Sequence, residues 1–273
     1  MKSLKYLTLV ILTGAFFFGC SGASKVESSF AGSGIKIDGD QSDWAGSLKT
    51  IEGDNMAYGF KNDGQNLYLC LVTSDASKAL RMLTMGLTVW LNPGSSKDEI
   101  GVKFPLKPDP SEMRDFRMQQ GQNNQGMRGD GQKRIQDLIS MQKELTVTNK
   151  DDLPLYSSSI ETAKDFQVKL GYEKDQFVYE LKVPLESNKN AQAVLKTQPG
   201  EDIEVKIETG KFDISQRQGG MRMGSGGGEG GNRPPMGGSG RQGGGRRGGG
   251  ERGAINRDSF KPIEYSFNVT LSK

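Results

Sequence analysis

The sequence predicts an all-β protein: an antiparallel β-sandwich carrying one short amphipathic helix and two long disordered insertions. Three observations predict this fold class. Residues 66–73 (NLYLCLVT) are almost continuously apolar, as in a central strand covered on both faces. Residues 265–271 alternate strictly between apolar and polar side chains, as in a strand with one buried face. Residues 87–91 run into an Asn-Pro-Gly turn at 92–94, and a second extended run at 100–104 completes a hairpin.

Composition is compatible with one large domain. The 273 residues are 34% hydrophobic, with a mean hydropathy of −0.58 and 38 glycines, many of them gathered in one tract. Outside that tract there is ample apolar sequence for a core. The formal net charge of +3 falls to about +1 without Lys2 and Lys5, so overall charge argues for no particular partner.

The chain contains no histidine, which excludes several functional classes. Ser-His-Asp and Cys-His nucleophile systems and His-ligated zinc or haem are ruled out. Haem would need methionine ligands such as Met56, Met82 or Met85, and nothing else in the sequence favours it. No pair of carboxylates stands out as a glycosidase pair. We therefore expect a protein that is not an enzyme.

The first segment predicts export. Lys2 and Lys5 precede an apolar run that ends at Gly19-Cys20, and residues 1–20 resemble a bacterial lipoprotein signal peptide. The resemblance implies acylation of Cys20, with ordinary secretion or an uncleaved anchor as the alternative. Ser21 is not aspartate, which implies an outer-membrane location. Residues 21–34 are small and polar and predict a flexible tether.

The remaining chain, 35–273, predicts a single sandwich domain. Further strands are expected where apolar residues alternate or cluster between turn signals. In chain order they cover 55–60, 146–150 and 155–161 as edge strands, 166–170, 176–184 and 203–212.

Two insertions interrupt this domain, at 107–145 and 213–257. Residues 107–131 are rich in Gln, Asn, Gly and Asp and predict disorder, whereas 132–145 has helical apolar spacing and predicts a surface helix over a sheet edge. The second insertion is a Gly/Arg-rich loop between two strands. It resembles RNA-binding RGG segments, but an exported lipoprotein does not meet RNA. The roles that remain for this loop are a solvated spacer or a contact to anionic polysaccharide. No nucleic acid partner is expected.

The segments IDGDQSDW, YGFKNDGQNLYLCLVTSD and GLTVWLNPGSSKDEIGVKFPL resemble the family 9 carbohydrate-binding modules and their DOMON-like relatives. The matching positions are Ile37, Asp38, Gly39, Asp43, Trp44, Asp63, Gly64, Leu67, Tyr68, Leu69, Ser74, Asp75, Asn92 and Pro93. The clear part covers 35–106. The resemblance implies an antiparallel β-sandwich and, more weakly, a sugar ligand, since its members differ in function.

Sugar binding requires aromatic platforms and hydrogen-bonding neighbours. The candidates are Trp90, Tyr58 and Tyr172, with core packing as the alternative for Trp90 and the expected role for Trp44. Cys70, in the strongest strand, is expected to be a buried inert thiol.

Asp38, Asp40 and Asp43 form an acidic cluster that could hold a structural calcium ion, as some family 9 modules do, or could simply shape the turn. No other cofactor is expected. The sequence thus predicts a non-catalytic lipoprotein that binds a glycan. The alternative is a structural or assembly lipoprotein whose sandwich binds a protein partner.

Overall fold

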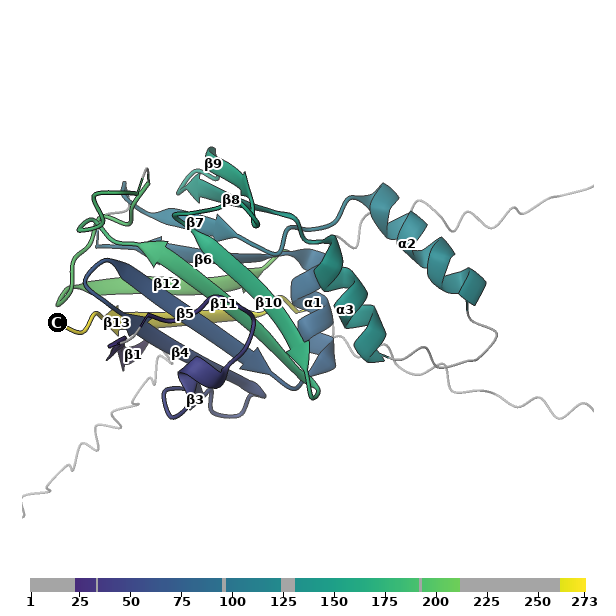
Figure 1. The fold of residues 1–273 in the computed structure, drawn as a ribbon, viewed down its shortest axis with the longest axis horizontal. Helices are drawn as coiled ribbons and strands as arrows, with labels where there is room; N and C mark the ends of the chain where they lie inside the picture. Colours follow the sequence, from purple (N-terminus) through teal and green to yellow (C-terminus); the bar gives the residue numbers. More distant parts are fainter. Residues whose placement is uncertain (1–22, 33, 95–96, 124–130, 192, 212–260) are drawn as a thin grey trace, which may run out of the picture.

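Two β-sheets pack face to face around one large hydrophobic core (Figure 1). The computed structural model describes residues 23–32, 34–94, 97–123, 131–191, 193–211 and 261–273. The seven-stranded sheet has the order β1 (Ser24–Glu27), β13 (Glu264–Thr270), β12 (Asp202–Thr209), β6 (Leu87–Asn92), β7 (Ile100–Lys103), β8 (Glu144–Asn149) and β9 (Pro154–Ser159). The six-stranded sheet has the order β10 (Gln167–Glu173), β11 (Gln176–Pro184), β5 (Asn66–Thr73), β4 (Met56–Asn62) and β2 (Ser29–Phe30), with β3 (Lys49–Thr50) also paired to β4.

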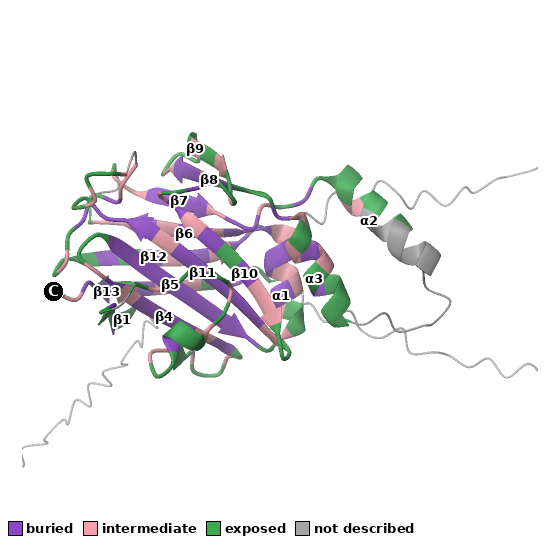
Figure 2. Ribbon diagram, viewed as in Figure 1, coloured by how far each residue is buried: buried purple, intermediate pink, exposed green. Residues whose placement is uncertain are grey.

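Strand β5 is the middle of the six-stranded sheet, between β11 and β4, and every one of its residues is buried (Figure 2). This confirms the prediction of a central strand covered on both faces. Its inner side chains face the seven-stranded sheet, and its outer side chains, including Cys70, face a second and smaller apolar cluster. Strands β6, β7, β10, β11, β12 and β13 also lie where the sequence predicted them, with each end within three residues.

The core between the sheets is built by alternation. In β6 and β12 the buried residues recur at every second position and the residues between them face outward. Aromatic side chains from opposite sheets meet in this core, where the ring centroids of Tyr58 and Phe267 are 4.4 Å apart.

Two helices cover one end of the sandwich. Helix α1 (Ala76–Met85) was not predicted; it is capped by the Asp75 side chain, which accepts hydrogen bonds from the amides of Ser77 and Lys78. Helix α3 (Gly131–Met141) lies beside α1 and contacts the edge strand β10 (Figure 1), which confirms the predicted surface helix over a sheet edge. Both helices bury an apolar stripe at helical spacing.

Helix α2 (Pro110–Asn123) occupies a segment that the sequence predicted to be disordered, and this prediction is wrong for these residues. The start signal was present. Proline suits the first helical position, and the Asp109 carboxylate accepts a 2.7 Å hydrogen bond from the Ser111 amide. Glu112 accepts in return from the Asp109 amide, so the helix begins with a capping box.

The N-terminal segment is not the flexible tether that its composition predicted. β1 pairs in parallel with β13, and β2 pairs in parallel with β4, so this short stretch joins both sheets. Val26 is buried opposite Val269, and Ser28 is buried between the sheets. The amide of Ser28 donates to the Thr270 carbonyl, and its hydroxyl contacts Asn62.

Some predictions fall outside the described residues. These are the signal peptide, the lipidation site Cys20 and the whole Gly/Arg-rich insertion at 213–257. Within the part of the chain that the structure describes, no helix has the length and apolarity needed to cross a membrane.

Candidate functional site

A single row of outward-facing residues crosses the seven-stranded sheet. Cross-strand pairing links Ser266 to Lys206, Lys206 to Trp90, Trp90 to Gly101, Gly101 to Thr148, and Thr148 to Pro154. We call these six residues the Trp90 row. Because the β6 neighbours Val89 and Leu91 face the core, Trp90 faces away from it, and its side chain is half-buried. Trp90 is therefore on the outer face, and the alternative of core packing between the sheets does not hold.

The indole of Trp90 lies over a glycine. A Cβ atom built on Gly101 would come within 2.6 Å of Trp90 Cζ3 and 2.7 Å of Cε3, so the six-membered ring occupies the space above that residue. On the opposite side of the ring system, Nε1 donates a 2.9 Å hydrogen bond to Glu208 Oε1 on β12. The ring is thus held at two edges, which fixes its orientation on the sheet.

Glu208 is itself held by an ion pair. Its second carboxylate oxygen lies 2.9 Å from the ammonium group of Lys206, which is 3.1 Å from Glu264 as well. Burial alone would raise the pKa of Glu208, but hydrogen bonds from Lys206 and Trp90 outweigh it, so the pKa lies below its usual value. The carboxylate that orients Trp90 therefore stays ionised at neutral pH.

The other two predicted platform residues do not join Trp90. Tyr58 is only 8% exposed and packs between the sheets against Phe267, so it has no face to offer a ligand and is corrected to a core residue. Tyr172 is half-buried in β10 of the other sheet, with its hydroxyl 3.5 Å from Asp175 Oδ1. Trp90, Tyr58 and Tyr172 therefore do not form one aromatic platform.

The three aspartates of the predicted calcium cluster are used in local turns. Each accepts a hydrogen bond from a backbone amide close in sequence: Asp38 from Asp40, Asp40 from Ser42, and Asp43 from Lys36. Among the described residues no group of three or more acidic, cysteine or histidine side chains could hold a metal ion. The turn-forming alternative therefore describes this segment.

The same segment holds Trp44 against the outer face of the six-stranded sheet. Trp44 is fully buried, and Nε1 donates to Glu180 Oε1 at 2.8 Å, while the amides of Asp38 and Gly39 donate to Oε2. Burial raises the pKa of Glu180 despite these donors. The Lys61 ammonium lies 5.4 Å from the centre of the Trp44 ring. The Ile-Asp-Gly…Trp motif thus fastens a loop to the sheet, and the core role predicted for Trp44 is confirmed.

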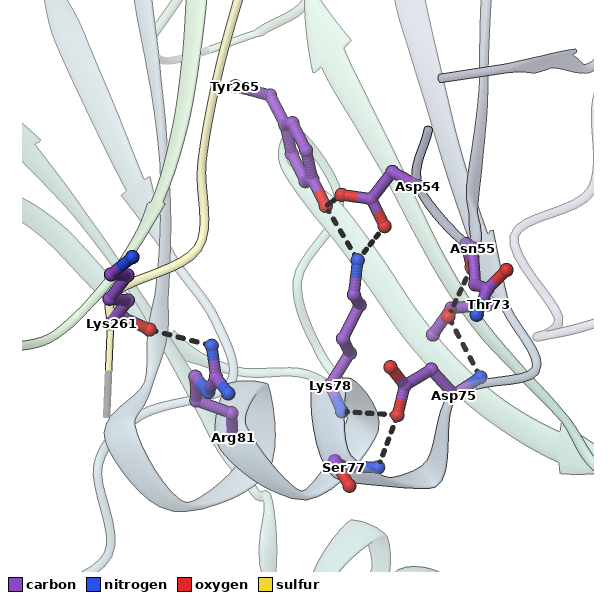
Figure 3. Close-up of polar contacts among 9 residues, drawn as sticks. All are labelled: Asp54, Asn55, Thr73, Asp75, Ser77, Lys78, Arg81, Lys261 and Tyr265. Atoms are coloured by element: carbon purple, nitrogen blue, oxygen red, sulfur yellow. Dashed lines mark hydrogen bonds and ion pairs between the residues drawn. The ribbon is translucent and has the colours of Figure 1, made fainter. Parts of the chain in front are cut away.

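A polar cluster closes the end of the sandwich beside α1 (Figure 3). Lys78 forms an ion pair with Asp54 and lies 3.5 Å from the Tyr265 hydroxyl, which donates to Asp54 at 2.8 Å. Burial, with help from Arg81, lowers the pKa of Lys78, and burial raises the pKa of Tyr265 to about 12. These residues join the helix to both sheets, which is a structural role.

Comparisons with known proteins found a distant structural likeness and no sequence match. No protein-family model and no curated protein matches the sequence. Among solved structures, the chain is similar to a family 9 carbohydrate-binding module from Caldicellulosiruptor kristjanssonii, in complexes with glucose and with cellotriose. In both comparisons the sequence identity is 12%, the TM-score is 0.33 and the match covers 70% of this chain. The match covers 81% of the chain in the glucose complex and 79% of the chain in the cellotriose complex. At such a low TM-score the likeness says nothing about the ligand.

Sequence reasoning named Trp90 but missed the residues that make it a site. Gly101 and Thr148 were hidden within predicted strands, and Glu208 is 118 residues from Trp90 along the chain. The one available signal was glycine inside an otherwise apolar strand, which often marks close approach by another group.

Proposed function

We propose that this chain is a non-catalytic lipoprotein, anchored in the outer membrane through a lipid on Cys20, that binds a carbohydrate through the outer face of its seven-stranded sheet. The observation that carries the proposal is the orientation of Trp90. Its ring lies over Gly101, is fixed by Glu208, and stands in a face whose neighbouring side chains are hydroxyls, amides and charged groups.

An aromatic ring with polar neighbours matches the two faces of a sugar. The C–H face of a pyranose ring packs against an indole, and hydroxyls around the ring exchange hydrogen bonds with polar side chains. Near Trp90 such groups are Thr88 and Asn92 on its own strand and Lys206 and Glu208 on β12. On β8 and β9, the hydroxyls of Thr146 and Ser157 lie 3.2 Å apart.

A direct test is a glycan titration of the mature protein followed by tryptophan fluorescence and calorimetry. Wild type should respond saturably to at least one glycan, and Trp90→Ala should lose the response while unfolding at a similar denaturant concentration. Tyr172→Ala is the matched control, since Tyr172 is half-buried on the other sheet. Unchanged binding by Trp90→Ala would refute the proposed site.

Anchoring has its own test. Metabolic labelling with a radioactive fatty acid should mark wild type, and Cys20→Ala should remain unlabelled and move from the membrane fraction to the soluble fraction. Equal membrane association of both proteins would refute an anchor on Cys20.

A second candidate function, binding of a protein partner, is favoured by a specific observation. Leu153 and Leu155, at the start of the edge strand β9, are 61% and 58% exposed. Exposed apolar residues at a sheet edge are common where another chain adds a strand. Leu155→Ser should then abolish capture of the partner, whereas Trp90→Ala should leave that capture unchanged.

A further inference from the structure

We propose that the ligand of the Trp90 row is an extended, uncharged glycan that lies across strands β6 to β9 and is bound through its interior residues rather than through a chain end. This inference rests on the proposed function and names the class of ligand for the same site.

The length of the row is the first argument. From Trp90 to Pro154 it crosses three strand spacings, about 14 Å, which exceeds the length of a single pyranose ring. Between these ends the Trp90 ring covers Gly101, and the next row residue, Thr148, has a short side chain that is only 1% exposed, so no long side chain of the row stands between Trp90 and Pro154. A ligand seated on Trp90 therefore has a continuous shelf along which to extend.

The far end of the shelf is apolar. Pro154 belongs to the row, and its neighbours Leu153 and Leu155 are both more than half exposed. This apolar surface lies three strands away from Trp90, so a long glycan chain bound on Trp90 can also pack against it, whereas a short glycan cannot reach it. This contact is what distinguishes an extended ligand from a single sugar bound on Trp90.

The position of Trp90 argues for interior residues. It stands inside the sheet, with β12 and β13 on one side and β7, β8 and β9 on the other. Its partners in the row on the two sides are Lys206 and Gly101, and Ser266 lies beyond Lys206. Gly101 has no side chain, and the ammonium group of Lys206 is held by Glu208 on β12 and Glu264 on β13, so a chain can continue past Trp90 in both directions.

Charge argues for an uncharged ligand. Lys206 and Lys103, which face outward near Trp90, are already paired: Lys206 with Glu208 and Glu264, and Lys103 with Asp152 at 2.5 Å. Glu204 is exposed on the same face of β12. A polyanion would have to break these ion pairs and approach additional carboxylates, whereas a neutral glycan would not.

The test is calorimetric titration with neutral oligosaccharides from disaccharide to hexasaccharide, each with a free or a borohydride-reduced end, and with polygalacturonate as the polyanion. Affinity should rise about tenfold or more between disaccharide and hexasaccharide, equivalent to about 1.4 kcal/mol. Reduction of the end should change nothing, and polygalacturonate should bind most weakly. Leu155→Ser should weaken hexasaccharide binding several-fold without affecting the disaccharide.

Phe30→Ser is the matched control, because Phe30 is 60% exposed on the other sheet and should leave every affinity unchanged. Equal affinity across the length series, loss of binding on end reduction, or preference for the polyanion would overturn this inference while leaving a Trp90-dependent sugar site intact. Binding of no glycan, or binding that survives in Trp90→Ala, would overturn the proposed function and this inference together.

Discussion

The indole of Trp44 donates a 2.8 Å hydrogen bond to the carboxylate of Glu180, and neither side chain has any exposed surface. The two residues are 136 positions apart, and the bond fastens the N-terminal loop to β11. Since the amides of Asp38 and Gly39 share the other oxygen, one buried carboxylate satisfies three donors. Gly171 makes room for this contact, because a side chain there would collide with the Gly39 backbone.

Glu180→Ala should therefore be costly. It leaves the buried indole N–H of Trp44 and two part-buried backbone amides without an acceptor, and we expect a loss of about 3 kcal/mol in the free energy of unfolding, measured by urea denaturation. Glu180→Gln keeps one acceptor oxygen and should lose less. An alanine variant that unfolds at the wild-type midpoint would contradict the role assigned to this carboxylate.

Gly101→Ala should displace Trp90 without straining the backbone. The added methyl would meet the indole at 2.6 Å, so the ring must swing away from the sheet. We expect a red shift in tryptophan emission and weaker glycan binding, with a small change in stability. Gly64→Ala serves as the control, because nothing lies within 4 Å of a Cβ at that position. Identical spectra for Gly101→Ala and wild type would show that Trp90 does not rest on this glycine.

The orientation of Trp90 should depend on pH through Glu208. Its pKa lies below the ordinary value of 4.5, so the unfolded chain takes up a proton more readily than the folded one. Its stabilising contribution is thus present above about pH 4.5 and is lost as the pH falls through the lowered pKa. Trp90 emission in wild type should change over that acidic interval.

Glu208→Gln removes the titrating group and should remove this change. The variant should show weaker anchoring of the indole at neutral pH and should lack the part of the acid emission change that wild type owes to Glu208. A profile that keeps the wild-type transition in Glu208→Gln would assign the effect to another carboxylate.

Tyr179→Phe should stabilise the protein. Tyr179 is fully buried, and within the described part of the chain its hydroxyl has no hydrogen-bond partner. Removing an unsatisfied buried hydroxyl should raise the free energy of unfolding by about 1 kcal/mol. Thermal and urea denaturation measure the change, with Tyr68→Phe as a contrast, because the Tyr68 hydroxyl donates to Asp63 at 2.7 Å and its loss should destabilise. A less stable Tyr179→Phe would reveal a partner for that hydroxyl.

The strands could be predicted because their signal is local. Alternation in β12 and β13 and the apolar run of β5 report burial directly, and these strands lie where expected. Helix α1 was missed although its signals are also local: Asp75 as a cap, then Ala79, Met82 and Leu83 at helical spacing. The helix has only ten residues and lies between β5 and β6 in the sequence, so the strand patterns on its two sides obscured it.

The candidate site could be predicted only in part, because it depends on register. The sequence offers Trp90 as one aromatic residue among several, but which of them faces outward follows from the pairing of β6 with β12 and β7. The contacts with Glu208 and Gly101 arise between strands that are distant in sequence. The N-terminal edge is similar, since Ser28 is recognisable as structural only beside Asn62 and Thr270.

The pairing of β1 with β13 limits the reach of the molecule. The first described strand begins at Ser24, so under the proposed acylation of Cys20 only residues 21–23 separate the lipid from β1, a span of about 10 Å at full extension. Such a linker is shorter than the sandwich itself. The domain would be held close to the bilayer, and a bound ligand would stay within one protein diameter of the lipid surface.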